Sequence, residues 1–259
     1  MKAVAVLLLV MCHLAVSHAW KCRAAPQLPT IMQIDAGQGK VVARDASYSV
    51  YMLCGTTWFK LGSPRLKHVT VGPGGIWGAD TSNRVYKYVN GQFQVAGGLY
   101  MQQVDAGGDG QIVGTTYNYY GYCLRSYLAA AFTGTGSLSW TYSSIYLRYY
   151  SCGPLYGCWA VDTSFRIWFT KKMVPTSCGI SRWTHIGGSA KMVEVGTDGT
   201  VFVVNRGGNV FQRTGITSGR PQGTRWTHIK MCLPIHHLSY DQRRLWVVTK
   251  GGIVMQCTH

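Results

Sequence analysis

Short apolar runs separated by turn residues dominate the chain, and they lack the period of three to four residues that marks an amphipathic helix. The clearest run is TVFVVN (200–205), which lies between the turn signals TDG and NRGG. Similar runs occur before it in AKMVEVG and after it in NVFQR. β-Branched and aromatic residues bounded by Gly, Asn and Asp are typical of strands. Together with 32 glycines and 8 prolines, the pattern predicts an all-β fold rich in turns.

The strand pattern recurs along the chain. The pentapeptide RWTHI occurs at 182–186 and again at 225–229. Alignment on its tryptophan gives a column of six segments: WKCR at 20, WFKL at 58, FQVA at 93, WTYS at 140, and WTHI at 183 and 226. A second column holds six strand-like segments, which end at Asp45, Asp80, Thr116, Asp162, Asn205 and Thr249. Long fixed periods of this kind are typical of repeat architectures.

These repeats predict a six-bladed β-propeller with four antiparallel strands per blade. An inner strand comes first, then the aligned segment, then a third strand, and finally the tryptophan strand. The approximate repeats are 20–57, 58–92, 93–139, 140–182, 183–225 and 226–259. We expect residues 20–259 to form this single domain. The side chains expected to pack between blades are Trp58, Trp140, Trp183, Trp226, His185 and His228.

The two ends of the repeat region predict how the propeller closes. The segment Trp20-Lys21-Cys22 is a tryptophan strand without the rest of its unit, and the chain ends on a third strand, GIVMQC. The N-terminal strand can therefore supply the outer strand that the last unit lacks. This arrangement would place Cys22 beside Cys257, and a disulfide there would fasten the closure.

Residues 1–19 have the features of a secretory signal peptide. Met1 and Lys2 precede the apolar run AVAVLLLVM, and Ser17 and Ala19 occupy the small-residue positions of a cleavage site. No later segment has the roughly 18 uninterrupted apolar residues of a transmembrane helix. We therefore expect cleavage after Ala19 and a secreted, extracellular protein that does not insert into membranes.

The cysteines suggest a disulfide framework. Removal of the signal peptide leaves eight of the nine cysteines, and an even number in an oxidising compartment predicts four disulfides. The spacing in CGPLYGC favours a short loop closed by Cys152 and Cys158. Three pairings remain open for Cys54, Cys123, Cys178 and Cys232. No C-x-x-C or H-x-x-x-H pair occurs, so neither zinc nor another metal or cofactor is expected.

The charge balance favours acidic partners. The chain has 25 Lys and Arg against 9 Asp and Glu. Such an excess favours phosphorylated or carboxylated surfaces, such as bacterial envelopes and acidic glycans. Nucleic acid would be bound only without sequence specificity. The basic residues are scattered rather than clustered, which is also consistent with a role in solubility alone.

The repeat pattern resembles a known family. The order W-x-x-I, a strand, V-(W/F)-x-V-(D/N) and V-(F/Y)-x-R resembles the tectonin repeat, and 183–225 matches it best. Six such units after a signal peptide are similar to the fish-egg lectins, a secreted tectonin family. Units three and four depart from the pattern at Phe93 and in the tyrosine-rich segments TTYNYYGYC and WTYSSIYLRYYSC. The resemblance implies a lectin of innate defence in eggs that binds N-acetylglucosamine-type glycans, bacterial envelope polysaccharide or lipopolysaccharide.

The candidate carbohydrate-binding residues lie in the turn after the second column. Polar side chains recur there, and each can hydrogen-bond a sugar hydroxyl: Asp45, Asp80, Asp162, Asn205 and Arg206. Arg206 can also bind a phosphate or carboxylate. Asp and Asn at such turns commonly cap the backbone, so these residues could instead only shape the turn. Several weak sites per chain would give avidity, which a homo-oligomer would increase.

Two other functions compete with sugar binding. A propeller glycosidase would need paired carboxylates, but Glu194 is the only glutamate and most aspartates fall at repeat-equivalent turns. No catalytic residues are therefore assigned, and the chain is not expected to be an enzyme. A structural egg-coat or matrix protein is the other alternative, and it predicts no binding that free sugar competes away.

Overall fold

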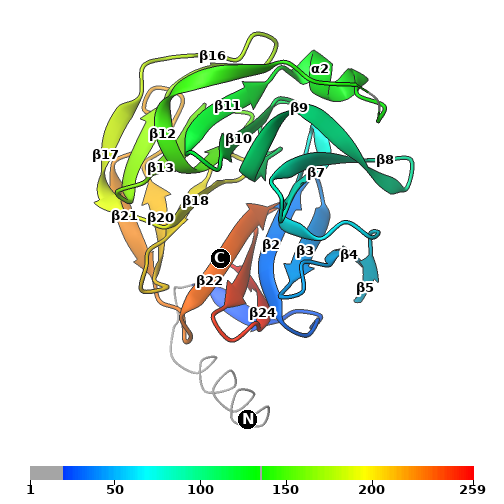
Figure 1. Cartoon of the computed structure of the whole chain (residues 1–259). Coiled ribbons are helices and arrows are strands. Elements are labelled where there is room, and N and C mark those ends of the chain that lie inside the picture. Colours follow the sequence, from blue (N-terminus) through cyan, green and yellow to red (C-terminus); the bar gives the residue numbers. More distant parts are fainter. Residues whose placement is uncertain (1–19, 135) are drawn as a thin grey trace.

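The computed structural model describes residues 20–134 and 136–259 and is built from β-strands, as the sequence predicts (Figure 1). The predicted signal peptide at 1–19 lies outside these residues. In the described part of the chain one helix occurs, α2 (Ser126–Ala131). None of the described helical residues forms a segment long and apolar enough to cross a membrane.

The strands follow one another in antiparallel sets of four, which we number along the chain. The first set is β2 (Ile31–Gly37), β3 (Lys40–Asp45), β4 (Val50–Cys54) and β5 (Thr57–Lys60). The second set is β6 (Leu66–Gly72), β7 (Gly75–Asp80), β8 (Arg84–Val89) and the first part of β9 (Gln92–Asp105). The third set is the rest of β9, β10 (Ile112–Thr116), β11 (Tyr120–Leu124) and the first part of β12 (Trp140–Cys152).

The remaining sets follow the same order. The fourth set is the rest of β12, β13 (Cys158–Asp162), β14 (Arg166–Thr170) and β17 (Thr184–Ser189). The fifth set is β18 (Met192–Val195), β19 (Val201–Val204), β20 (Val210–Thr214) and β21 (Arg225–Ile229). The sixth is β22 (Ile235–Asp241), β23 (Arg244–Thr249), β24 (Val254–Thr258) and β1 (Lys21–Ala24). A hairpin, β15 (Met173–Val174) and β16 (Gly179–Ile180), lies between β14 and β17.

The N-terminal strand completes the last set, as predicted. β1 pairs with β24 in antiparallel register, with Cys22 opposite Cys257, and a disulfide joins these two cysteines. The blue first set lies beside the red last set (Figure 1), where β2 contacts both β22 and β23. The two ends of the described chain are therefore held together by strand pairing and by a covalent bond.

The first strands of the six sets contact one another in a cyclic order. β2 contacts β6 and β22, and the order continues from β6 through β9, β12 and β18 to β22. Six buried side chains, one per first strand, each accept the backbone N–H of a residue in the next first strand. The pairs are Asp35 to Val71 (2.7 Å), Thr70 to Ala106 (3.0 Å), Asp105 to Cys152 (3.0 Å), Ser151 to Val195 (3.1 Å), Glu194 to Tyr240, and Ser239 to Ala36 (2.8 Å). We call these six acceptors the inner ring.

The inner ring alternates carboxyl and hydroxyl side chains. Each of the six satisfies a backbone donor that would otherwise be buried without a partner, which is costly in a protein interior. The Ser239 hydroxyl also lies within hydrogen-bond distance of Glu194 (2.5 Å) and Asp35 (2.9 Å), so the ring links its members as well as the strands. The only glutamate is therefore occupied in holding neighbouring sets together.

The carboxyls of the inner ring predict a pH dependence of stability. Burial, followed by the nearby Asp35, raises the pKa of Asp105 to about 7. Between pH 5 and pH 7 the folded protein thus retains a proton that the unfolded chain releases, and stability falls as the pH rises. Relative to the Asp105→Asn variant, the wild type should lose about 2 to 3 kcal/mol between pH 5 and pH 7.5. Urea unfolding of both proteins measures this, and an equal difference at both pH values would contradict it.

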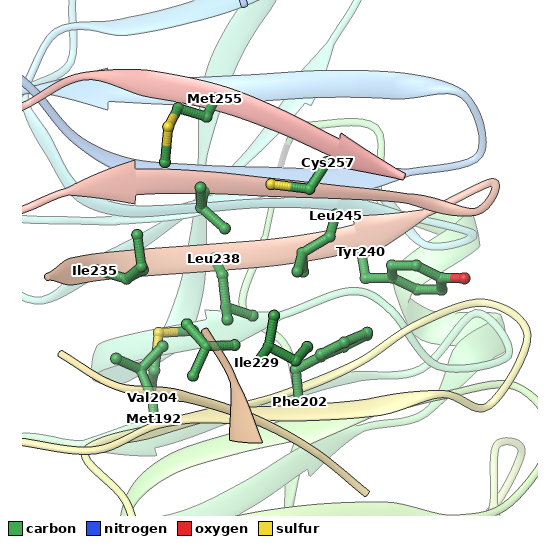
Figure 2. Packing of buried hydrophobic residues seen from close by; sticks show 12 residues of the cluster. Met192, Phe202, Val204, Ile229, Ile235, Leu238, Tyr240, Leu245, Met255 and Cys257 are labelled. Carbon is green, nitrogen blue, oxygen red and sulfur yellow. The ribbon is translucent and has the colours of Figure 1, made fainter. Parts of the chain in front are cut away.

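Apolar side chains fill the spaces between neighbouring sets. Between the fifth and sixth sets, Phe202 and Met192 on one side face Leu238 and Leu245 on the other (Figure 2).

The tryptophans of the last strands also connect sets, as predicted. Three of the four indole N–H groups donate to the preceding last strand or, for Trp58, to the N-terminal segment: Trp58 to Pro26 (2.9 Å), Trp183 to Ser143 (3.2 Å) and Trp226 to Gly187 (2.8 Å). The fourth, Trp140, packs against buried residues of the second and third sets, and its buried indole N–H has no hydrogen-bond partner among the described residues.

Three disulfides join pairs of described cysteines. They are Cys22–Cys257, Cys152–Cys158 and Cys123–Cys178. The first two match the sequence-based assignments, and the third selects one of the pairings that the sequence left open. Cys54 is an exposed free thiol at the end of β4, so the prediction that all eight cysteines pair with one another was wrong at this position.

Candidate functional site

The turn that follows the second strand has one geometry in all six sets, and we call it the capped turn. One residue, at the end of the second strand or directly after it, has an oxygen in its side chain. This oxygen accepts a hydrogen bond from the backbone N–H of the residue four positions later. The pairs are Asp45 to Ser49 (2.9 Å), Asp80 to Arg84 (2.8 Å), Thr116 to Tyr120 (3.1 Å), Asp162 to Arg166 (2.9 Å), Asn205 to Asn209 (3.0 Å) and Thr249 to Ile253 (3.1 Å). This bond explains why the column carries short side chains with an oxygen acceptor.

The predicted aspartates face into their turns. Asp45, Asp80 and Asp162 are 8%, 4% and 4% exposed. Burial by itself would raise the pKa of Asp162, but hydrogen bonds from Trp168 and Arg166 lower it below its ordinary value. The carboxylate therefore stays ionised while it is covered by protein. The structure places these aspartates where they orient other side chains, and the exposed groups at the turn are those that they hold.

Two capped turns hold an exposed arginine against an aromatic ring. In the second set, Asp80 accepts Arg84 Nε at 2.7 Å and the Tyr86 hydroxyl at 3.1 Å, and the guanidinium lies 5.8 Å from the centre of the Tyr86 ring. In the fourth set, Asp162 accepts Arg166 Nε at 2.7 Å and Trp168 Nε1 at 2.9 Å, and the guanidinium lies 5.5 Å from the indole.

These two arginines are available to a ligand. The side chains of Arg84 and Arg166 are 53% and 58% exposed. Because Nε is used by the aspartate, the two terminal NH₂ groups of each guanidinium carry four further donors in a fixed plane. Planar donors beside an aromatic ring suit a sugar, which presents hydroxyl oxygens on its edge and C–H groups on its face.

A recurring heptapeptide marks this arrangement in the sequence, and the sequence-based prediction used only part of it. The heptapeptides DASYSVY, DTSNRVY and DTSFRIW begin at Asp45, Asp80 and Asp162. The fifth residue is arginine in the second and third heptapeptide and serine in the first. Only the first residue of the pattern was selected from the sequence, although the arginine that reaches solvent comes four residues later.

Arg206 connects the fifth set to the capped turn of the fourth. Its guanidinium lies 4.8 Å from the centre of the Phe165 ring, and Arg148 lies 5.0 Å from the same ring. Phe165 is the fourth residue of its turn and has a φ of +64°, which is uncommon for a bulky side chain. Of the five predicted residues, Asp162, Asn205 and Arg206 therefore lie in the turns of the fourth and fifth sets, and Asp45 and Asp80 lie in the turns of the first and second sets.

The RWTHI histidines do not pack between sets, so that prediction was wrong. His185 lies 5.3 Å from the Trp168 ring, and His228 lies 5.0 Å from Phe211. Both histidines are exposed and face the third strand of their own set. His185 thus adds a polar aromatic ring beside the Arg166 and Trp168 pair. Within the described residues, no group of three or more His, Cys, Asp or Glu side chains could hold a metal ion.

Comparison with known proteins gives matches in sequence and in structure. A sequence model of the Tectonin domain matches residues 30–250. The "Fish-egg lectin" of Cyprinus carpio is 39% identical over 157 residues, which cover 60% of this chain and 65% of the carp protein, slightly less than two thirds of its length.

Solved structures show the same fold at low identity. Virginiamycin B lyase from Staphylococcus aureus superposes with a TM-score of 0.59 at 15% identity, covering 90% of this chain and 83% of the lyase. Prp20p from Saccharomyces cerevisiae superposes with a TM-score of 0.58 at 8% identity, covering 96% and 83%. These likenesses indicate a propeller-like fold and carry no information on function.

Proposed function

The chain belongs to the tectonin family, and on that premise we propose that it is a secreted lectin that binds N-acetylglucosamine-type glycans through its capped turns. The observation that carries the proposal is the pair of arginines that buried aspartates hold against aromatic rings. Arg84 with Tyr86 and Arg166 with Trp168 form the two sites. A lectin is also what the resemblance to the carp protein supports.

The proposed architecture is one six-bladed propeller that spans residues 20–259, with each set of four strands as a blade. The cyclic contacts of the first strands support this architecture. The inner ring supports it as well, because its last bond, from Ser239 to Ala36, returns from the sixth set to the first. A closed ring repeats the capped turn around one face and so can present several sites on one chain.

Each proposed site pairs an arginine with an aromatic ring. The guanidinium donates to the ring hydroxyls or to the acetamido oxygen of the sugar. In the fourth blade the partly exposed Trp168 ring packs against the C–H groups of the sugar, whereas Tyr86 is 6% exposed and supports Arg84 from below. In the fourth blade, His185 and the neighbouring Arg206 over Phe165 extend the surface. Asp45 and Asn205 shape the equivalent turns of blades that lack the arginine, and we assign them a weaker role in binding.

Bacterial envelope polysaccharide and lipopolysaccharide are the proposed targets. The net charge of +16 supports an anionic surface as the target. Weak sites on one chain gain avidity on a surface that repeats its sugars, and assembly into homo-oligomers would add to it. A role without catalysis is consistent with the carboxylates of the inner ring, since Asp35, Asp105 and Glu194 are buried and bonded to neighbouring strands.

Retention on immobilised N-acetylglucosamine tests the proposal. The mature chain should bind the matrix and elute with free N-acetylglucosamine but not with the same concentration of mannose. A glycan array then ranks the sugars. If no sugar on the array is bound, the chain is better explained as a structural component of an extracellular matrix.

A further inference from the structure

A cavity lies at one end of the first strands, the end at which the capped turns also lie. Its volume is about 270 Å³, and seven residues of the second, third and fourth sets line it: Lys67, His68, Gln102, Gln103, Tyr119, Arg148 and Tyr149. Tyr119 belongs to a capped turn, and the other six come from first strands. The cavity is separate from Arg84 and Arg166, which do not line it.

The cations of this cavity have no carboxylate partner. In residues 20–134 and 136–259 the ion pairs are those of Arg84 and Arg166, and neither Lys67 nor Arg148 takes part in one. Lys67 Nζ donates to the neutral side chain of Asn83, and Arg148 lies over Phe165. Burial lowers the pKa of Lys67, and the opposing charge of Asp80, which is already paired with Arg84, does not reverse this shift.

The same position of the first strand is basic in other sets. The six equivalent residues, each three positions before the inner-ring residue of its set, are Met32, Lys67, Gln102, Arg148, Lys191 (just before β18) and His236. Three of them are cations, one is a histidine and none is acidic. An end of the propeller with this composition attracts anions.

Burial and nearby cations lower the pKa values of two histidines at this end. Burial, followed by the charges of Arg44 and Lys67, lowers the pKa of His68 to about 3. Burial, followed by Lys191, Arg44 and Lys250, lowers the pKa of His236 to about 4. His68 therefore lines the cavity as a neutral ring. An anion in the cavity would offset the positive charge of the cations around it.

We infer that this cavity binds the phosphate group of a phosphorylated saccharide. Lys67 supplies a point charge and Arg148 a planar pair of donors, the two cation types that bind phosphate oxygens in proteins. The neutral donors of Tyr119, Gln102 and His68 lie beside them and suit the sugar. The inference deepens the proposed lectin function, because it assigns the anionic part of an envelope glycan to a site apart from the two amino-sugar sites.

Calorimetric titration with three probes tests the inference at an ionic strength of about 0.15 M, where distant charges are screened. The probes are inorganic phosphate, N-acetylglucosamine and N-acetylglucosamine 6-phosphate. The test variant combines Lys67→Gln with Arg148→Gln. The matched control combines Lys171→Gln with Arg220→Gln, which removes the same charges from exposed positions.

The wild type should bind the phosphorylated sugar at least about tenfold more tightly than the neutral sugar. The test variant should lose that advantage and its binding of inorganic phosphate, while its affinity for N-acetylglucosamine and the properties of the control variant stay unchanged. Phosphate binding of equal strength in the test variant and the wild type would overturn the inference, as would equal affinity of the wild type for both sugars. Loss of phosphate binding in the test variant when N-acetylglucosamine is not bound at all would support this site and reject the amino-sugar sites.

Discussion

Replacement of Trp183 by alanine is expected to lower the free energy of unfolding by about 3 to 5 kcal/mol, the usual cost of truncating a buried aromatic residue. Trp183 is 8% exposed, and its ring lies 5.5 Å from that of Tyr150 in an edge-to-face contact. Its indole N–H donates to Ser143, 40 residues earlier in the chain. The truncation therefore removes apolar contacts and a hydrogen bond between two neighbouring blades.

Urea unfolding of matched variants measures this effect. Trp183→Phe keeps a ring and loses the indole N–H, so it should cost less than the alanine variant. Tyr117→Ala removes an aromatic residue that is 58% exposed and should change stability by no more than about 0.5 kcal/mol. A stability loss for Trp183→Ala as small as that for Tyr117→Ala would show that the tryptophan column does not hold the blades together.

Removal of the disulfide at the closure should have a comparably large effect. Cys22 and Cys257 are 235 residues apart, and a cross-link of such long range restricts the unfolded chain strongly. The variant Cys22→Ser with Cys257→Ser should lose about 3 to 5 kcal/mol of stability. β1 still pairs with β24 in this variant, so we expect a folded protein with a lower melting temperature.

Cys54→Ser is the control for the closure variant. Cys54 is an exposed free thiol, so its replacement should leave the melting temperature unchanged. Peptide mapping under non-reducing conditions should recover Cys22 linked to Cys257. A link from Cys22 to another cysteine, or equal stability of the closure variant and the control, would contradict the closure by the N-terminal strand.

The strands and their repetition were predictable from sequence because their signals are local. Runs such as TVFVVN between turn residues specify a strand without reference to distant contacts. The tryptophan column was predictable for the same reason, since each copy recurs at a fixed place in its unit. The place of Cys22 beside Cys257 followed from counting strands in the first and last units.

The inner ring could not be predicted in this way. Its six members alternate between carboxyl and hydroxyl groups, so the column shows no single residue type. Their common feature is a bond to the backbone of the next set of strands, which exists only in the folded protein. The histidines of RWTHI were misassigned because a two-residue period gives the side of a strand but does not give the neighbour on that side.

The candidate site was predicted in part. The turn was found from its recurring aspartate, and the role of the aspartate as a support for Arg84 or Arg166 became visible only through the ion pairs. A carboxylate in a turn can point outward to a ligand or inward to the backbone, and the sequence pattern is the same in both cases. The arginine four residues later distinguishes the second and fourth blades from the others.

The most direct test of the lectin function is titration of N-acetylglucosamine into the wild type and into a variant with Arg84→Ala and Arg166→Ala. We predict that the double variant loses at least about tenfold in affinity, whereas an Asn205→Ala, Arg206→Ala variant loses less and a control with Arg220→Ala and Arg244→Ala binds as the wild type does. Each single variant should lose one of the two proposed sites while the protein stays folded, with a lower melting temperature because a buried aspartate loses its partner. Full affinity and stoichiometry in the double variant, with the sugar bound by the wild type, would contradict the account.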